Sequence, residues 1–168
     1  MRPSSIAVSG GRAPPGSPTS ITSPKSPSSW QATEGRDPLV VLGALLHDTV
    51  EDTATTEDEL EAEFGAEVAR LVAEVTDDKR LPKAERKRLQ IETAPHKSDR
   101  AKLIKIADKT SNLRGIANSP PVDWDLARQR EYFVWAARVV EGCRGVNPWL
   151  ETIFDVAHRD GLARLAGR

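Results

Sequence analysis

From Asp37 to the C-terminus, apolar residues recur every three or four positions, and prolines stand only at the breaks between these stretches. This spacing is typical of helices that bury one face, because residues at i, i+3, i+4 and i+7 lie on the same side. No stretch alternates apolar and polar residues for long enough to indicate a strand. The sequence therefore predicts an all-α fold.

Seven helices are expected, separated by prolines, glycines and capping residues. Pro38 suits a first helical turn, and Thr56 is a good N-cap for the second helix. Gly65 should separate the second helix from the third. By position, we predict helices over about 38–52, 57–64, 66–75, 82–94, 99–118, 125–142 and 148–160.

The segment before Asp37 has a different composition. Residues 1–36 are rich in Ser, Pro, Gly and Thr and contain almost no apolar clusters. Such a segment buries too little surface to offset its loss of conformational entropy, so we expect it to be disordered. The predicted organisation is a tail over residues 1–36 and one helical domain over residues 37–165.

Charge and composition exclude several classes of protein. The 168 residues contain 24 basic and 25 acidic side chains, which argues against a nucleic-acid coat protein. Cys143 is the single cysteine, so an internal disulfide framework is excluded. No apolar run is long enough for a membrane span, and the N-terminus lacks the apolar core of a signal peptide. We expect a cytoplasmic protein with no nucleic-acid or membrane partner.

The stretch from Leu45 to Thr53 carries an unusual set of polar residues at the end of an apolar helix. On a continuous helix, His47, Asp48, Glu51 and Asp52 fall within an arc of about 140°. An imidazole and three carboxylates on a buried helix are costly unless a cation compensates them, which indicates a divalent metal site. The alternative is that these acids are simply solvated in the last turns of the helix.

A second polar position lies in the long helix expected over 99–118. Asp108 interrupts an otherwise apolar stripe, and Asn112 follows one turn later on the same face. A lone carboxylate is poorly tolerated on such a face, so Asp108 is a candidate metal ligand. The alternative is an ion pair with Lys105 or Lys109.

Several motifs together resemble one known family. The His47-Asp48 pair followed by Glu51 and Asp52, with a distant Asp108, resembles the metal-binding core of HD hydrolases. The stretches 74–79, 81–88, 108–114 and 131–137 further resemble the SpoT-related branch of these enzymes, in particular its small stand-alone metazoan members. The resemblance covers about residues 37–165.

This resemblance implies a role for each matching residue. His47, Asp48 and Asp108 would be metal ligands, and imidazole with carboxylates suits Mn²⁺. Glu51 and Asp52 would orient or deprotonate the attacking water. Lys83 and Asn112 would contact phosphate or ribose, and Tyr132 would line the nucleotide pocket. For Lys83, a solvated lysine on a charged helix remains an alternative.

The resemblance also implies a reaction. Its members remove the 3′-pyrophosphate of guanosine tetraphosphate (ppGpp), and the metazoan member is associated with removal of the 2′-phosphate of NADPH. Two other hypotheses remain open at this point: a non-catalytic module that binds nucleotide or forms a homodimer, and a poorly folded isoform without a biochemical role.

One residue that the resemblance implies has no counterpart. The family's site uses a further histidine on a helix upstream of the HD pair, whereas this chain contains no histidine before His47. His96 is expected in a loop and His158 on the surface of the last helix, and neither is a convincing replacement. We therefore expect a domain truncated at its N-terminal helices, such as an alternative isoform, with three of four metal ligands.

Overall fold

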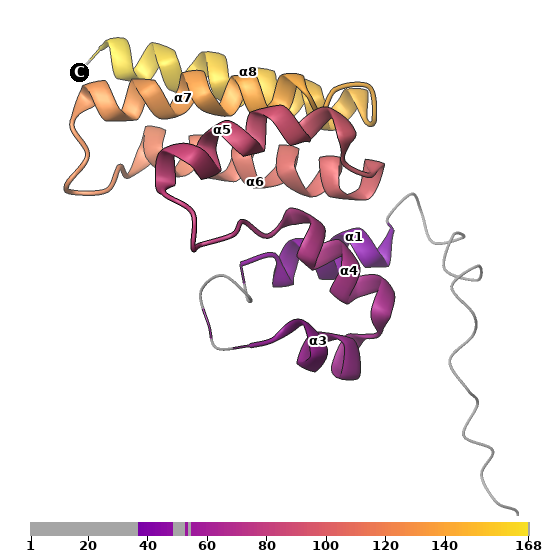
Figure 1. Ribbon diagram of the computed structural model, residues 1–168. Helices are drawn as coiled ribbons and strands as arrows, with labels where there is room; N and C mark the ends of the chain where they lie inside the picture. Colours follow the sequence, from indigo (N-terminus) through magenta and orange to yellow (C-terminus); the bar gives the residue numbers. More distant parts are fainter. Residues whose placement is uncertain (1–36, 49–52, 54, 168) are drawn as a thin grey trace, which may run out of the picture.

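The computed structural model describes residues 37–48, 53 and 55–167, and this part of the chain contains helices and no strand (Figure 1). The all-α prediction is confirmed. The elements, in chain order, are α1 (Pro38–Leu46), α3 (Glu57–Phe64), α4 (Ala66–Val75), α5 (Lys83–Thr93), the short 3₁₀ helix η2 (Ala94–His96), α6 (Asp99–Asn118), α7 (Leu126–Glu141) and α8 (Pro148–Ala166).

Helix α6 is the central element of the molecule. It contacts α7 and α8 on one side, and α1 and α4 on the other. Figure 1 shows the two groups in these positions, with α5 beside α7 and with α3 packed on α4. Side chains on α6 can therefore meet groups from both halves of the fold.

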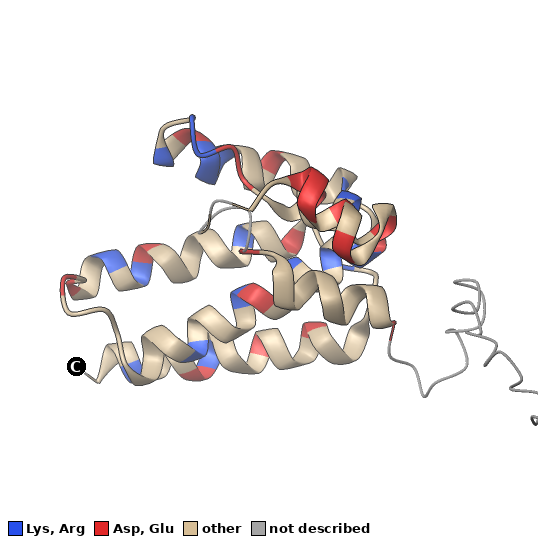
Figure 2. Ribbon diagram, turned by 90° about the horizontal axis from the view of Figure 1, so that it is seen from below, with Lys and Arg blue, Asp and Glu red and all other residues tan. Residues whose placement is uncertain are grey.

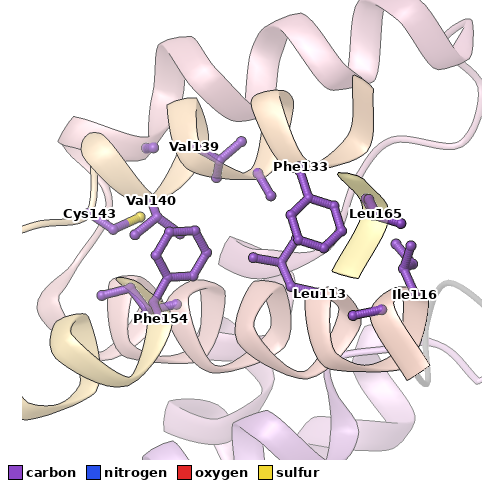
Figure 3. Close-up of a cluster of buried hydrophobic side chains, with 12 residues drawn as sticks. Leu113, Ile116, Phe133, Val139, Val140, Cys143, Phe154 and Leu165 are labelled. Atoms are coloured by element: carbon purple, nitrogen blue, oxygen red, sulfur yellow. The ribbon is translucent and has the colours of Figure 1, made fainter. Parts of the chain in front are cut away.

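The larger core fills the space between α6, α7 and α8. Phe133 of α7 and Phe154 of α8 are completely or almost completely buried there, together with Leu113 of α6 and Leu165 of α8 (Figure 3). Burying one such side chain contributes about 1.5–3 kcal/mol through the hydrophobic effect. This cluster holds the helix on which Asp108 lies.

A second core joins α1 to α3 and α4. Leu39, Leu42 and Leu46 of α1 are partly buried and pack against a cluster that includes Leu60 and Val72. Val41 and Leu45 are exposed, so α1 is not the buried helix that its apolar sequence predicted. Because these three leucines are held, the last turn of α1 has a defined position next to α6.

Gly43 lets α1 approach its neighbours closely. A Cβ atom at this position would lie 2.8 Å from Cδ1 of Ile104 on α6 and 3.0 Å from Cδ2 of Leu71 on α4. The first of these contacts is shorter than real Cβ atoms show, so a larger residue here would force the ends of the Ile104 and Leu71 side chains to shift. The close approach brings the end of α1 to the middle of α6.

Two polar side chains fix the starts of α1 and α6. Asp37 accepts a hydrogen bond from the backbone N–H of Leu39 at 3.0 Å, and its other oxygen lies 2.6 Å from Nε of Arg100 on α6. Ser98 caps α6 and is itself held by Glu74, whose carboxylate accepts from its N–H and its hydroxyl. These bonds satisfy exposed helix ends and tie α1 and α4 to α6.

Two predicted helix boundaries are wrong. Helix α1 ends at Leu46, so His47 is its C-cap and Asp48 lies in the following turn, whereas the spacing predicted a helix to Asp52. Helix α8 continues to Ala166 instead of ending near Asp160, because the buried Leu165 still packs on the main core. Residues 49–52 and the predicted tail lie outside the described residues.

The arc that the continuous helix predicted for His47 and Asp48 therefore does not apply. Their side chains are placed by a helix end and a turn, not by two successive helical turns. None of the helices in the described ranges has the length and apolar character needed to cross a membrane.

Candidate metal and nucleotide site

His47 is held in one orientation by the backbone of its own helix. Its Nδ1 atom lies 2.6 Å from the carbonyl oxygen of Ala44. A carbonyl oxygen only accepts, so Nδ1 carries a proton and donates. In the neutral ring, Nε2 then presents a lone pair, which is the form that binds a metal.

Two carboxylates approach this free nitrogen. Nε2 of His47 lies 3.1 Å from Oδ2 of Asp48 and 3.6 Å from Oδ1 of Asp108. The nitrogen is buried and has no hydrogen-bond partner within the described residues. The structure thus brings together the three side chains for which the sequence predicts a metal site.

Electrostatics in the cluster favour a bound cation. The Asp108 carboxylate is the main cause that raises the pKa of His47; burial opposes it, and the Ala44 carbonyl and Asp48 add to it. Burial by itself would raise the pKa of Asp108, but the interactions with His47 and Lys109 outweigh it and hold this pKa well below its ordinary value. Asp108 is therefore ionised at neutral pH, and the cluster attracts positive charge.

These donors fit a divalent metal. Ligands about 2.1 Å from an octahedral ion lie about 3 Å from one another, which is close to the spacing around Nε2 of His47. Across residues 37–48, 53 and 55–167, no group of three or more His, Cys, Asp or Glu side chains is arranged to hold a metal ion. The fit rests on the buried nitrogen without a partner and on the two carboxylates beside it.

The alternative reading of Asp108 is also present in the structure. Nζ of Lys109 lies 2.8 Å from Oδ2 of Asp108, while its other oxygen accepts from Nδ2 of Asn112 at 2.7 Å. Lys105 instead donates to the carbonyl of Val75 at 2.7 Å. Asp108 is thus both an ion-pair partner of Lys109 and a neighbour of His47, so the two interpretations do not exclude each other.

A cavity of about 560 Å³ opens between α5 and α7. Lys83 and Tyr132, which the sequence predicts to bind substrate, both line it. Asn112 interacts with the phenol of Tyr132, and its amide donates to Asp108. A chain of contacts therefore connects the cavity with the candidate metal ligands.

Three aromatic side chains form one wall of this cavity: Trp124, Tyr132 and Trp135. The Tyr132 ring lies 5.7 Å from that of Trp124 and 5.2 Å from that of Trp135, measured between centroids. Burial raises the pKa of Tyr132 far above its ordinary value, so its phenol remains neutral. Flat aromatic surfaces of this kind suit a nucleobase.

Basic residues accompany the aromatic wall. Arg128 stacks over Trp124 at 4.5 Å, and Lys109 lies 4.6 Å from the Trp135 centroid. Figure 2 shows basic residues around the start of α5 and acidic residues gathered over α3, away from it. The cavity therefore combines aromatic and cationic groups, which is what a nucleotide with several phosphates requires.

Sequence reasoning did not identify Trp124, Arg128 or Gln90 as cavity residues. Trp124 precedes α7 and Arg128 lies in its first turns, and only the position of α5 beside α7 gives them a shared role. The sequence offers one signal for these residues. Trp124 and Arg128 stand four positions apart in a chain with few aromatic residues.

Other predicted residues have different outcomes. Glu51 and Asp52 lie outside the described residues, so their catalytic role stays a prediction. His158 was expected on the surface, but it is half-buried and stacks on Phe154 at 5.9 Å. His96 ends η2 and is exposed.

Comparison with known proteins identifies the family of this site. The family model described as HD domain matches residues 15–138, which is most of the chain. The chain belongs to the HD-domain family. The matched range contains the His47-Asp48 pair and Asp108, so the candidate metal ligands lie in the HD domain.

Named relatives of this HD domain are also similar in sequence. The chain is 61% identical over 115 residues to human guanosine-3′,5′-bis(diphosphate) 3′-pyrophosphohydrolase MESH1, and the match covers 68% of this chain and 64% of that protein. The Xenopus tropicalis protein of the same name is 55% identical over 128 residues, covering 76% and 72%. The chain thus spans somewhat less than two thirds of the length of its human relative.

A solved structure gives the same result for the fold. It belongs to a protein described as a metazoan orthologue of SpoT that hydrolyses ppGpp and plays a role in starvation responses. The TM-score is 0.72 at 51% identity, covering 74% of this chain and 70% of the other. The HD-domain fold predicted from the motifs is therefore confirmed.

Proposed function

We propose that this chain is a metal-dependent nucleotide hydrolase that removes the 3′-pyrophosphate of guanosine tetraphosphate. The observation that carries the proposal is the contact chain from His47 through Asp108 and Asn112 to Tyr132 in the cavity. This chain of contacts supports the proposal because it links the candidate metal ligands to a pocket that suits a nucleotide. The activity for which the relatives are named supports the same substrate.

The HD residues would hold one divalent ion, for which we propose Mn²⁺, with His47, Asp48 and Asp108 as ligands. When bound, such an ion supplies positive charge to the phosphate oxygens and lowers the pKa of water. His47 would present Nε2 because its Nδ1–H is committed to Ala44. Asn112 would hold Asp108 in place through its amide N–H.

The reaction adds water across one phosphorus–oxygen bond. The water oxygen would bond to the phosphorus attached to the 3′ oxygen. The bond between that phosphorus and the 3′ oxygen would break. Pyrophosphate would leave, and the 3′ oxygen would take a proton to become the hydroxyl of guanosine diphosphate. Glu51 and Asp52 are proposed to orient the water and accept its proton.

The cavity residues would bind the rest of the substrate. Tyr132 would pack against the base or ribose, and Lys83 would contact phosphate. NADPH, through its 2′-phosphate, is a second proposed substrate because the wall of the cavity offers more than one aromatic surface. We further propose that the protein acts in the cytoplasm and that it forms a homodimer.

Phosphate and pyrophosphate release by the purified chain tests the proposal. The chain is loaded with Mn²⁺ and incubated with guanosine tetraphosphate or NADPH, alongside a variant in which Asp48 is replaced (Asp48→Ala). We expect release by the wild type and none by the variant. Equal release by both would contradict the proposal, and nucleotide binding without release would favour the non-catalytic module.

A further inference from the structure

The start of α5 carries four cations, and the structure separates them into two pairs. Lys87 has a local partner, because its Nζ lies 3.0 Å from Oε1 of Glu131. Arg88 lies between two acids of its own helix and pairs with both Glu85 and Glu92. The charges of these two residues are already compensated.

The other two cations, Lys83 and Arg86, have no ion pair within the described residues. They stand three positions apart on α5, so they share one face of the helix, and both line the 560 Å³ cavity. Arg88 is not among the residues that line it, whereas Lys87 lines it next to Glu131, its ion-pair partner. The unpaired positive charge of α5 is thus directed at the cavity.

The hydrogen bonding of Arg86 also indicates that a ligand is missing from this site. Its Nε–H is buried and finds no hydrogen-bond acceptor in the described part of the chain. A buried donor without an acceptor is unfavourable, and such groups are rare in native proteins unless a ligand or water completes them. The guanidinium therefore lacks an acceptor at the wall of a cavity.

One turn further along α5, Gln90 shows the complementary feature. Its Nε2 donates to Oδ2 of Asp77 at 2.5 Å, which fixes the orientation of the amide, because a carboxylate only accepts. Its Oε1 is then buried without a donor in the described residues. The same wall thus offers one unused donor and one unused acceptor.

We propose that Arg86 binds a phosphate group of the nucleotide in this cavity, with Lys83 as its partner and with Lys87 and Arg88 excluded from that role. A planar guanidinium matches two phosphate oxygens, and its Nε–H is one of the donors of this fork. Gln90 accepts from a hydroxyl or N–H of the same ligand. The nature of the ligand rests on the proposed function, whereas anion binding by Arg86 does not.

The test measures binding without turnover. Inorganic pyrophosphate and guanosine diphosphate are titrated calorimetrically into the full chain in chelator, using wild type, Arg86→Gln, Arg86→Lys and the matched control Arg88→Gln. We expect Arg86→Gln to weaken pyrophosphate affinity at least tenfold, Arg86→Lys to restore part of it, and Arg88→Gln to change it less than twofold. Circular dichroism confirms that each variant retains its helices.

Three results would overturn the assignment: no pyrophosphate binding by the wild type, unchanged affinity in Arg86→Gln, or an equal loss in Arg88→Gln. A parallel hydrolysis assay separates this inference from the proposed function. Binding through Arg86 without hydrolysis would refute only the proposed function. Hydrolysis with an unchanged KM in Arg86→Gln would refute only the role of Arg86.

Discussion

Nε2 of His47 lies 3.6 Å from Oδ1 of Asp108, although the two residues stand 61 positions apart in the sequence. His47 follows the last turn of α1, and Asp108 lies in the middle of α6. The contact exists because α1 packs tightly on α6. The candidate metal site therefore depends on the packing of these two helices as much as on its ligands.

Replacing Asp108 by asparagine should abolish metal binding and hydrolysis. The change keeps the size of the side chain but removes the negative charge that faces His47 and Lys109. Loss of groups that only support a ligand lowers metal affinity 10–100-fold, so loss of a ligand should lower it by more than about 100-fold. Mn²⁺ titration by calorimetry and phosphate release measure the two effects.

The matched control is Asp99→Asn, an exposed aspartate in the first turn of the same helix. It should leave metal affinity unchanged. Retained Mn²⁺ affinity in Asp108→Asn would show that Asp108 is only a partner of Lys109.

Replacing Gly43 by alanine should disturb the packing of α1 on α6. The added Cβ would meet the ends of the Ile104 and Leu71 side chains, which are buried and must shift to admit it. Overpacking of this kind costs about 1–3 kcal/mol of unfolding free energy. Urea unfolding measures the cost, and metal affinity should fall with it because His47 moves away from Asp108.

Gly115→Ala is the control for this prediction. A Cβ atom at Gly115 meets nothing within 4 Å, and the residue lies inside α6. Alanine there should stabilise the protein by about 0.5–1 kcal/mol. If both alanine variants behaved alike, the close approach at Gly43 would not matter.

Replacing Gly161 by alanine should disturb the contact between α7 and α8. The new Cβ would lie 2.6 Å from Cζ of Phe133, a ring that is completely buried (Figure 3). We expect a loss of about 1–3 kcal/mol. The double variant with Phe133→Leu should lose less than the sum of the two single changes, because the smaller side chain leaves room for the methyl group. Additive losses in thermal unfolding would argue against a direct clash.

The buried thiol of Cys143 should make stability depend on alkaline pH. Burial is the main cause that raises the pKa of this thiol above its ordinary value of about 8.5. Because the unfolded chain loses the proton first, stability is fully present below the unfolded pKa and is lost as the pH rises from there through the folded pKa. Native protein should also react slowly with a thiol reagent at pH 8.

Cys143→Ala should flatten this pH dependence from about pH 8 upward. Urea unfolding at a series of pH values measures it in both proteins. Rapid modification of the native wild type would mean that Cys143 is accessible, contrary to its complete burial.

Most of the helices could be predicted because their signals are local. The capping of α3 by Thr56, for example, follows from residue type and spacing alone. The pairing of His47 with Asp108 could be predicted only from the resemblance to a family. No local rule relates a residue of α1 to one of α6.

The end of α1 and the cavity could not be predicted in the same way. The polar run after Leu46 is compatible with a longer helix, and the turn at Asp48 depends on how the chain leaves the tight packing against α6. The cavity depends on the placement of α5 beside α7, which brings Gln90 and Trp124 to one wall. Such features arise from tertiary packing, which periodicity does not encode.

Helix α6 packs on the main core through one side and on α1 and α4 through the other, and the second contact is much smaller than the first. Its buried residues are Leu71, Val75, Ala101 and Ile104, so α1, α3 and α4 can open while the other helices stay folded. Such an opening would carry His47 and Asp48 away from Asp108. A bound metal would hold α1 against α6. Its removal should therefore speed amide hydrogen exchange in α1 more than in α7 or α8.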